Sequence, residues 1–251
     1  AEGGIPPAVA VRTRHPIAEV IADPSYRAFW LSSFLSSIIF GGARFAWVWV
    51  VLEATDSPAD AALAGGIALG LPNLLFSLPV GAYADRFDRR RMVLGASAFA
   101  TAVLLVTATL AAFDRLTLVA ALATAFALGI TVSVVQPVQT AMVPQLVPPR
   151  LHLTGIALQN LSLQSSFFVG SLVTGALIDL TGAAATFLVL AALQAASGLF
   201  MLPITFRAVD VARPAGARPT LRRSIRDGLS YTLRHQPLRS LAIANFVIGL
   251  V

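Results

Sequence analysis

The sequence contains no cysteine and no lysine, and it is poor in charge of either sign. Among its 251 residues only 12% are charged, whereas 57% are hydrophobic, and the mean hydropathy is +0.78. A soluble domain carries about twice that share of charge. The lack of cysteine excludes disulfides, thiol catalysis and thiolate metal sites, although it does not identify a compartment. The composition therefore predicts an integral membrane protein.

The sequence also lacks the patterns of a metal site, a nucleic-acid-binding surface or an enzyme. Its histidines are far apart in predicted loops and have no ligand spacing, so neither a metal nor a cofactor is expected. The net charge is +6, but the basic residues lie between apolar runs. We therefore expect the lipid bilayer, and no nucleic acid, as a partner. No nucleophile is paired with a base, which argues against an intramembrane enzyme.

Apolar runs of membrane-spanning length recur along the chain. About 20 residues of helix cross a bilayer core, and we expect six such helices, at residues 28–51, 61–83, 92–113, 116–139, 155–178 and 183–206. Trp30 and the pair Trp47 and Trp49 bracket the first run, which predicts an aromatic belt at each membrane face. A final run, 241–251, is too short to cross and predicts the start of a seventh helix.

The polar segments predict the order of the domains. We expect a cytoplasmic N-terminal segment, a six-helix domain, a cytoplasmic linker and a truncated seventh helix, at residues 1–27, 28–206, 207–237 and 238–251. In the first segment, Ile17, Val20 and Ile21 predict a short surface helix. In the linker, one apolar stripe predicts an amphipathic helix along the membrane, with a plain solvated linker as the alternative; the stripe consists of Leu221, Ile225, Leu229 and Leu233.

Arginine is distributed very unevenly between the two predicted membrane faces. All 18 basic residues are arginine, and all except Arg44 and Arg115 lie on the side of the N-terminus. Cytoplasmic loops carry an excess of positive charge. We therefore expect a multi-pass protein of the cell (plasma, or inner) membrane with its N-terminus in the cytoplasm.

One short loop carries a specific motif between the second and third apolar runs. Residues 81–91 read Gly-Ala-Tyr-Ala-Asp-Arg-Phe-Asp-Arg-Arg-Arg. The spacing Gly-x-x-x-Asp-Arg-x-x-Arg-Arg resembles the loop between transmembrane helices 2 and 3 of the major facilitator superfamily of secondary transporters. Asp88 stands where that family usually has glycine, which puts the tightness of the turn in question.

The resemblance implies a fold and a mode of action. It implies an all-α integral membrane protein, a six-helix bundle of two inverted three-helix repeats, which is the N-terminal half of a twelve-helix fold. It also implies secondary active transport of a small-molecule substrate by alternating access, with the second half of the transporter as a partner that is missing here. The implied gating motif consists of Gly81, Asp85, Arg86, Arg89 and Arg90. In it Asp85 reaches a helix of the second half, and Arg86 and Arg89 pair with nearby acids.

Two further stretches resemble one branch of the superfamily, the exporters of drugs and of siderophores such as enterobactin. They are the entry to the first helix, residues 24–30, and the proline-rich loop 143–150. Helix 5 carries part of an antiporter motif in Gly170 and Gly175, with Ser171 where proline is usual. These matches favour a proton-coupled antiporter that exports its substrate, although the arginine of a second antiporter motif is missing from helix 4.

An internal repeat supports the inverted architecture. Gly81-Ala-x-x-Asp85 ends the second run, and Gly175-Ala-x-x-Asp179 ends the fifth, at the opposite predicted face. An inverted repeat of three helices leaves such a trace. It predicts that residues 28–113 superpose on 116–206.

Polar residues inside the apolar runs are candidates for a substrate cavity. Asn160, Gln164 and Ser165 on helix 5, with Gln136 and Gln139 on helix 4, either line a central cavity or bond between helices. Arg44 is the one charge well inside a run and is a candidate of the same kind. It lies one turn from Trp47, so snorkelling to the outer interface is the alternative.

A different class of function stays open at this point. A half-length membrane protein that transports nothing, and serves as a scaffold or dimer partner, has the same composition. No Asp, Glu or His occupies the middle of a predicted span. Because guanidinium does not lose its proton in proteins, we expect any proton carrier to belong to the second half.

Overall fold

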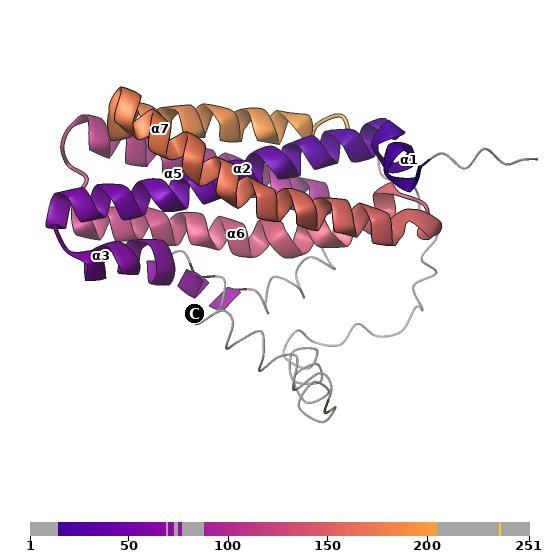
Figure 1. The fold of residues 1–251 in the computed structure, drawn as a ribbon, viewed down its shortest axis with the longest axis horizontal. Coiled ribbons are helices and arrows are strands. Elements are labelled where there is room, and N and C mark those ends of the chain that lie inside the picture. The colour runs from indigo at the N-terminus through magenta and orange to yellow at the C-terminus, as the bar shows by residue number, and fades with distance from the viewer. Residues whose placement is uncertain (1–14, 69, 73–74, 77–87, 205–235, 237–251) are drawn as a thin grey trace, which may run out of the picture.

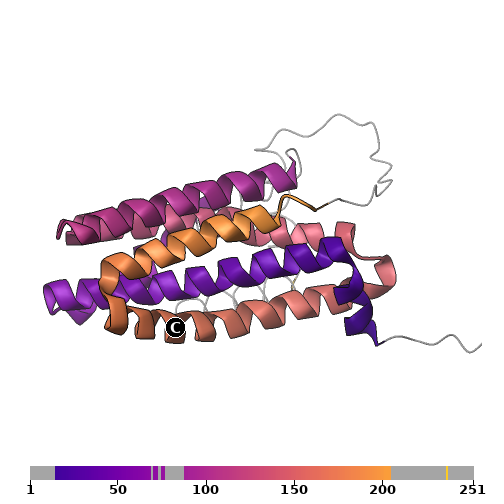
Figure 2. The same cartoon turned by 90° about the horizontal axis from the view of Figure 1, so that it is seen from above.

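The chain forms a bundle of long helices in a computed structural model that describes residues 15–68, 70–72, 75–76, 88–204 and 236. Most of these residues are helical, and no strand occurs among them. Figures 1 and 2 show the long helices side by side along one axis. Four stretches are long and apolar enough to cross a membrane, and they contain α2 (Pro24–Thr55), α5 (Arg89–Ala112), α6 (Leu118–Leu146) and α7 (His152–Phe200). The all-helical membrane class is confirmed, and the six-helix repeat stays a prediction.

The helix α7 is two antiparallel arms joined at a sharp bend. Gly182 has φ 79° and ψ 170° inside it, a conformation that glycine adopts at little cost. The first arm, residues 152–181, contains the predicted span 155–178, and the second arm, residues 183–200, contains most of the predicted span 183–206. The bend is visible in Figure 1 where the orange ribbon reverses.

The bundle has two ends that bring distant parts of the chain together (Figure 1). One end holds the short helix α1 (Pro16–Ala22) and the starts of α2, α5 and α7, and we name it the α1 end. The other holds Gly182, the short helix α3 (Pro58–Ala62) and the turn between α5 and α6, and we name it the Gly182 end. The chain therefore runs back and forth along the bundle as the apolar runs predict.

Capping residues set the ends of α2 beyond the predicted limits. The Asp23 carboxylate accepts hydrogen bonds from the backbone N–H groups of Ser25 at 2.9 Å and Tyr26 at 3.2 Å. Pro24 occupies the first helical turn, where its missing N–H costs nothing, so α2 begins before the predicted Ala28. At the other end α2 continues to Thr55, past the predicted end at residue 51, which corrects that boundary.

The predicted proline-rich loop 143–150 is partly helix. The helix α6 continues to Leu146 with Pro137 and Pro144 inside it, and a single 3₁₀ turn, η2 (Pro149–Leu151), leads into α7. The loop boundary at Val143 is therefore wrong. Proline is tolerated within membrane helices because neighbouring helices, hydroxyl side chains and water satisfy the backbone groups that it frees.

Several predictions lie outside the described residues. The second predicted span is described at its start, where α3 is followed by a π-helical stretch, η1 (Leu63–Ala68). The gating residues Gly81, Asp85 and Arg86, the linker helix and the seventh helix lie outside the described ranges. The superposition of the two repeats, which needs Gly81, stays a prediction.

Glycines hold α2 and the first arm of α7 in backbone contact, which we name the glycine seam. A Cβ atom added at Gly170 would lie 2.2 Å from the backbone oxygen of Ile38, and one added at Gly41 would lie 2.9 Å from the Cα of Phe167. A Cβ atom at Gly42 would lie 2.2 Å from Oγ1 of Thr174. Only residues without a side chain allow helices to approach so closely.

Buried hydroxyl groups tie the second arm of α7 to α2 and α5. Ser197 Oγ lies 2.6 Å from Ser36 Oγ and donates to the backbone oxygen of Ser32 at 2.9 Å. On the α5 side, Gln194 Nε2 donates to Ser97 Oγ at 3.0 Å. Such interhelical hydrogen bonds are each worth about 0.6 kcal/mol on average within a membrane.

Trp47 belongs to the core of the bundle and to no aromatic belt. Its side chain is fully buried, its ring centroid lies 5.2 Å from that of Phe187, and its Nε1 donates to Thr124 Oγ1 at 3.2 Å. The belt prediction is wrong for this residue, whereas the neighbouring Trp49 is 47% exposed. Hydrophobicity alone does not distinguish the lipid-facing side of a helix from its buried side.

Candidate functional site

A small polar pocket lies between α2, α6 and the first arm of α7, and we name it the α2–α6–α7 pocket. Its volume is about 20 Å³. Its lining is uncharged, with one apolar member, and consists of Ser33, Ser37, Gln136, Gln139, Thr140, Gln159, Asn160, Ser162 and Leu163. The pocket thus brings together three of the residues that the sequence offers for a cavity, namely Gln136, Gln139 and Asn160.

Two polar side chains in the pocket lack hydrogen-bond partners. Ser33 is 3% exposed and Gln139 is 6% exposed. Within the described part of the chain, neither Ser33 Oγ nor Gln139 Nε2 has a partner. An unsatisfied buried polar group costs about 1–3 kcal/mol, and most such groups in native proteins bind protein or ordered water. The pocket therefore has unused hydrogen-bonding capacity.

The protons of the other three hydroxyl groups around the pocket, those of Ser37, Thr140 and Ser162, are already engaged. Ser37 Oγ donates to the backbone oxygen of Ser33 at 2.8 Å, and Thr140 Oγ1 donates to that of Gln136 at 3.1 Å. Ser162 Oγ donates to the backbone oxygen of Leu158 at 2.9 Å. These hydroxyls keep lone pairs that accept hydrogen bonds. The pocket therefore offers amide donors beside hydroxyl acceptors, a surface suited to neutral polar groups.

Reasoning from the sequence missed five of the polar residues that line the pocket, Ser33, Ser37, Thr140, Gln159 and Ser162. A signal for part of this set was present. Ser33 and Ser37 are four residues apart, as are Gln136 and Thr140, so each pair shares one helix face. Neither spacing alone predicts that these two helix faces meet.

The other predicted cavity residues do not line the pocket. Gln164 is exposed on the first arm of α7, as is Ser165, whose hydroxyl donates to the backbone oxygen of Leu161 at 2.8 Å. Arg44 is also exposed. It lies 11 residues after Ser33 and 7 after Ser37, close to whole numbers of helical turns, so it extends the same face of α2 toward the Gly182 end.

The described part of the predicted gating motif ties helix ends together at the α1 end. Arg89 Nη1 donates to the backbone oxygen of Ala141 in α6 at 2.6 Å, and Arg90 Nη2 donates to the backbone oxygen of Leu202 beyond α7. Through these two contacts the start of α5 is bound to the ends of two other helices.

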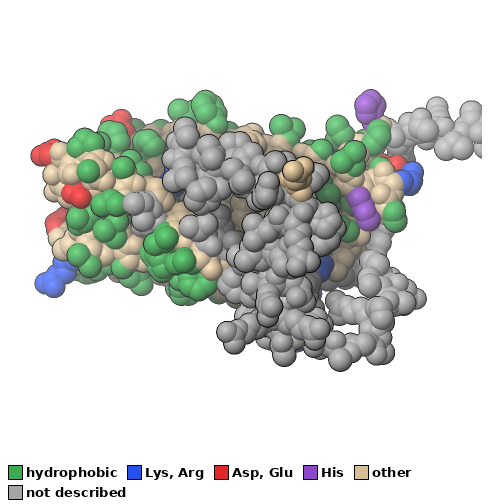
Figure 3. Space-filling view, turned by 90° about the horizontal axis from the view of Figure 1, so that it is seen from below, with side chains coloured by type: hydrophobic (Ala, Val, Ile, Leu, Met, Phe, Trp, Pro, Cys, Tyr) green, Lys and Arg blue, Asp and Glu red, His purple; other side chains and the backbone are tan. Residues whose placement is uncertain are grey.

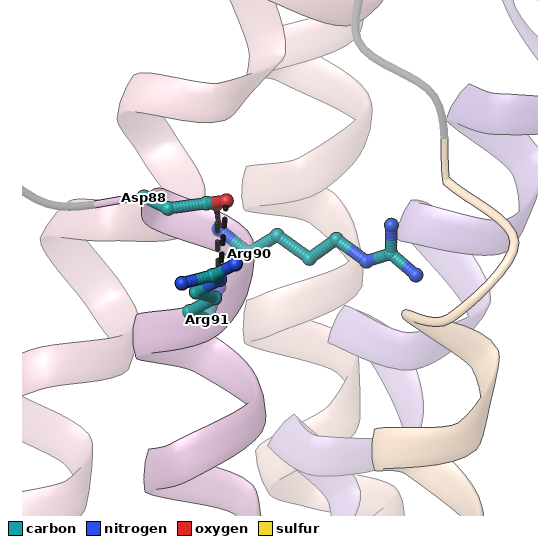
Figure 4. Close-up of polar contacts among 3 residues, drawn as sticks. All are labelled: Asp88, Arg90 and Arg91. Atoms are coloured by element: carbon teal, nitrogen blue, oxygen red, sulfur yellow. Dashed lines mark hydrogen bonds and ion pairs between the residues drawn. The ribbon is translucent and has the colours of Figure 1, made fainter.

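Asp88 has a local structural role that accounts for its place in the motif. Its Oδ1 accepts hydrogen bonds from the backbone N–H groups of Arg90 at 2.9 Å and Arg91 at 3.4 Å, as Figure 4 shows. Its Oδ2 lies 3.8 Å from Arg91 Nε. Asp88 is thus the N-cap of α5, a position for which aspartate is among the preferred residues. The capping bond explains how aspartate is accommodated where the family usually has glycine.

An ion pair joins α1 to the turn between α6 and α7. Arg150 Nη2 contacts Glu19 Oε1, and Val20 of α1 is buried beside Val147 and Leu151. An open cavity of about 370 Å³ adjoins this pair, with Asp23 also in its lining. Of the stripe predicted for α1, Val20 is buried, while Ile17 and Ile21 are exposed at 50% and 36%.

The residues of the helix 5 motif lie in different environments. Gly170 is at the centre of the glycine seam, and a Cβ atom at Gly175 would lie 3.3 Å from the ring of Phe45. Ser171, which stands where proline is usual, donates to the backbone oxygen of Phe167 at 2.9 Å. Asp179 is exposed near the Gly182 end. Gly170 and Gly175 therefore serve helix packing against α2.

The two ends of the bundle differ in charge. Among the described residues, the Gly182 end carries the carboxylates of Glu53, Asp56, Asp60, Asp114 and Asp179 against Arg115 alone. On the face seen in Figure 3, most of the visible acidic side chains lie at one end of the bundle, and histidine side chains lie at the other. The described arginines of the α1 end are Arg27, Arg89, Arg90, Arg91 and Arg150.

Long apolar helices that could cross a membrane are the features of a multi-pass membrane protein. The family model described as transmembrane secretion effector, within the major facilitator superfamily, matches residues 17–251. The chain belongs to that family, whose members are membrane transporters and not enzymes. A search of the curated proteins finds no match to this chain.

Proposed function

We propose that the chain forms one half of a secondary transporter that exports a small amphipathic molecule, such as a drug or a siderophore, by alternating access. The observation that carries the proposal is the α2–α6–α7 pocket, because it presents unpaired neutral polar groups within a bundle of apolar helices. The pocket has room for one hydroxyl-sized polar group of such a cargo, whose apolar remainder contacts the surrounding apolar helices. Membership of a transporter family supports the same conclusion.

In the proposed orientation, the α1 end lies on the cytoplasmic side of the cell membrane. The distribution of arginine supports it, since Arg115 is the one arginine among the described residues at the Gly182 end. Arg44 then contributes to the cargo pathway from the face of α2 that also carries Ser33 and Ser37. The proposed proton carrier lies in the second half of the transporter.

The proposed gate lies at the α1 end. Arg89 and Arg90 support it by binding the start of α5 to its neighbours. Asp85 acts there on a helix of the second half, where a carboxylate is favoured by about 0.3–1 kcal/mol at a helix N-terminus. Asp85→Asn is then expected to leave the transporter assembled but poorly closed on that side. Unchanged transport together with unchanged accessibility of the α1 end would count against the gate.

The transport proposal is tested with the complete transporter in proteoliposomes under an imposed pH gradient. Accumulation of the amphipathic dyes ethidium and Hoechst 33342 is measured with and without the gradient. We expect gradient-dependent accumulation of at least one dye, and a changed rate in Asn160→Leu, which alters the pocket. The matched control is Gln164→Leu, an amide on the same arm outside the pocket. Transport that both variants leave unchanged would remove the pocket from the pathway.

The coupling proposal needs a separate measurement. Glu53, Asp88 and Asp179 are neutralised one at a time in the complete transporter. Each variant is expected to keep its gradient dependence, because these carboxylates lie at helix ends. A variant that equilibrates dye but no longer responds to the pH gradient would place proton coupling in this half and overturn the proposal.

A further inference from the structure

The two unpartnered atoms of the α2–α6–α7 pocket lie on different helices. Ser33 Oγ belongs to α2 and Gln139 Nε2 to α6, and both residues line the same pocket. Gln139 Nε2 is a donor only, whereas a serine hydroxyl both donates and accepts. One small group that accepts from Gln139 and exchanges a hydrogen bond with Ser33 satisfies both atoms at once.

The size of the pocket limits what that group is. The volume of about 20 Å³ exceeds the roughly 10–15 Å³ that one water molecule needs. It is too small for a ring or a side-chain-sized fragment. A bound group therefore has the size of a single water molecule or hydroxyl.

The chemistry of the lining limits its charge. Every polar residue that lines the pocket is a serine, threonine, asparagine or glutamine. An ion there would lose its hydration without gaining a counter-charge, which costs far more than the hydrogen bonds return. The lining instead supplies the two to four polar partners that a buried water requires.

The sequence of α6 shows why such a site forms at this point. Pro137 stands between Gln136 and Gln139, and it has no N–H for the backbone oxygen of Ser133. Local opening of a membrane helix at proline is compensated by neighbouring helices, by hydroxyl side chains and by ordered water. The pocket lies beside that turn and is lined by residues on both sides of the proline.

We propose that the α2–α6–α7 pocket binds one water molecule, which accepts a hydrogen bond from Gln139 Nε2, exchanges one with Ser33 Oγ and so joins α2 to α6. The water site does not depend on transport, and it stands or falls separately from the proposed function. A cargo group that enters the pocket displaces this water without loss only when it reproduces the same hydrogen bonds.

The experiment is a double-mutant cycle in the complete transporter, held in lipid nanodiscs without any added solute. Ser33→Ala, Gln139→Leu and the double variant are compared by their apparent melting temperatures. Each single change is expected to lower the melting temperature by about 2–4 °C, because it leaves the water and the other side chain underbonded. The double variant is expected to fall by clearly less than the sum, since both changes remove the same water.

Two results would overturn the water site. If the pocket is dry, both atoms are unsatisfied in the native protein, and replacing them with apolar groups raises the melting temperature. If the two losses add fully, the side chains do not share one bound molecule. The direction of the shift in melting temperature and the coupling between the two substitutions each test the water site without any substrate.

Matched controls use the same chemical changes outside the pocket. Ser165→Ala and Gln164→Leu lie on exposed positions of α7, and both are expected to shift the melting temperature by less than about 1 °C, with no coupling. Gln139→Met provides a second apolar replacement of similar length if Gln139→Leu does not assemble. A rise in melting temperature for either replacement overturns the proposal.

Discussion

The first arm of α7 meets two neighbours in opposite ways. Against α2 it forms the glycine seam, in which Gly41, Gly42 and Gly170 leave no space for even one methyl group. Where it faces both α2 and α6, it borders a polar pocket in which Ser33 of α2 and Gln139 of α6 hold unpartnered atoms. The first contact is made by backbone and has one arrangement, while the second has hydrogen-bonding capacity to spare.

The difference shows how one helix serves both structure and recognition. Close backbone packing gains dispersion energy and leaves no freedom to repack, so the glycine seam suits a unit that moves as one body. Unpaired neutral groups gain energy only when something binds them, so the pocket suits an exchangeable occupant. Substitutions in the glycine seam should therefore lower stability, whereas substitutions in the pocket should change transport.

The largest effect is expected from Gly170→Ala. The added methyl group would overlap the backbone oxygen of Ile38, which only a shift of a whole helix relieves. We expect a loss of about 3 kcal/mol of stability, seen as a lower melting temperature and less assembled protein. Gly95→Ala on α5 is the matched control, because no atom lies within 4 Å of its new Cβ. If the two variants lose equal stability, the contrast between the glycine seam and the pocket fails.

A smaller effect is expected from Tyr26→Phe. Tyr26 is fully buried in α2, and its hydroxyl donates to the backbone oxygen of Gly155 at 2.8 Å near the start of α7. Removing the hydroxyl should cost about 1 kcal/mol, the usual worth of one hydrogen bond. The melting temperature checks it, and transport by the assembled protein should persist. A stable variant that no longer transports would show that this side of α7 also serves recognition.

On the pocket side, Gln136→Ala should separate stability from transport. Gln136 lines the pocket but is only partly buried, so its loss should change stability by less than about 0.5 kcal/mol. The rate of dye transport in proteoliposomes should nevertheless change, because the pocket loses an amide. Unfolding and transport are measured on the same preparation. A large loss of stability with unchanged specific transport would show that the pocket, like the glycine seam, serves structure and not transport.

Single cysteines placed at the two ends of the bundle are expected to leave its stability unchanged. They test whether the two ends face opposite sides of the membrane. The chain has no cysteine of its own, so Arg91→Cys and Arg115→Cys each carry one thiol. The Arg91 side chain is 88% exposed at the α1 end, and Arg115 is exposed at the Gly182 end. A membrane-impermeant maleimide should label them from opposite faces of the membrane. Labelling of both from one face would contradict the topology.

The class of the protein and the approximate places of its helices follow from local features of the sequence. The positions of α5 and α6 follow from long apolar runs, and Asp23 and Asp88 begin helices by capping their own neighbours in the chain. The motif of residues 81–91 indicates the same superfamily that the family match shows. These features depend on hydrophobicity and on hydrogen bonds between residues a few positions apart, which a sequence displays directly.

Which polar and small residues meet depends instead on how the helices pack. Gln139 and Gln164 look alike as amides in apolar helices, yet one is buried in the pocket and the other is exposed. Trp47 and Trp49 look alike as belt residues, yet Trp47 is fully buried. The meeting of Gly41 with Phe167, across more than a hundred residues, depends on how α2 and α7 cross and how each is rotated about its axis. Rotation and crossing follow from packing against several helices at once, and no local stretch of sequence contains that information.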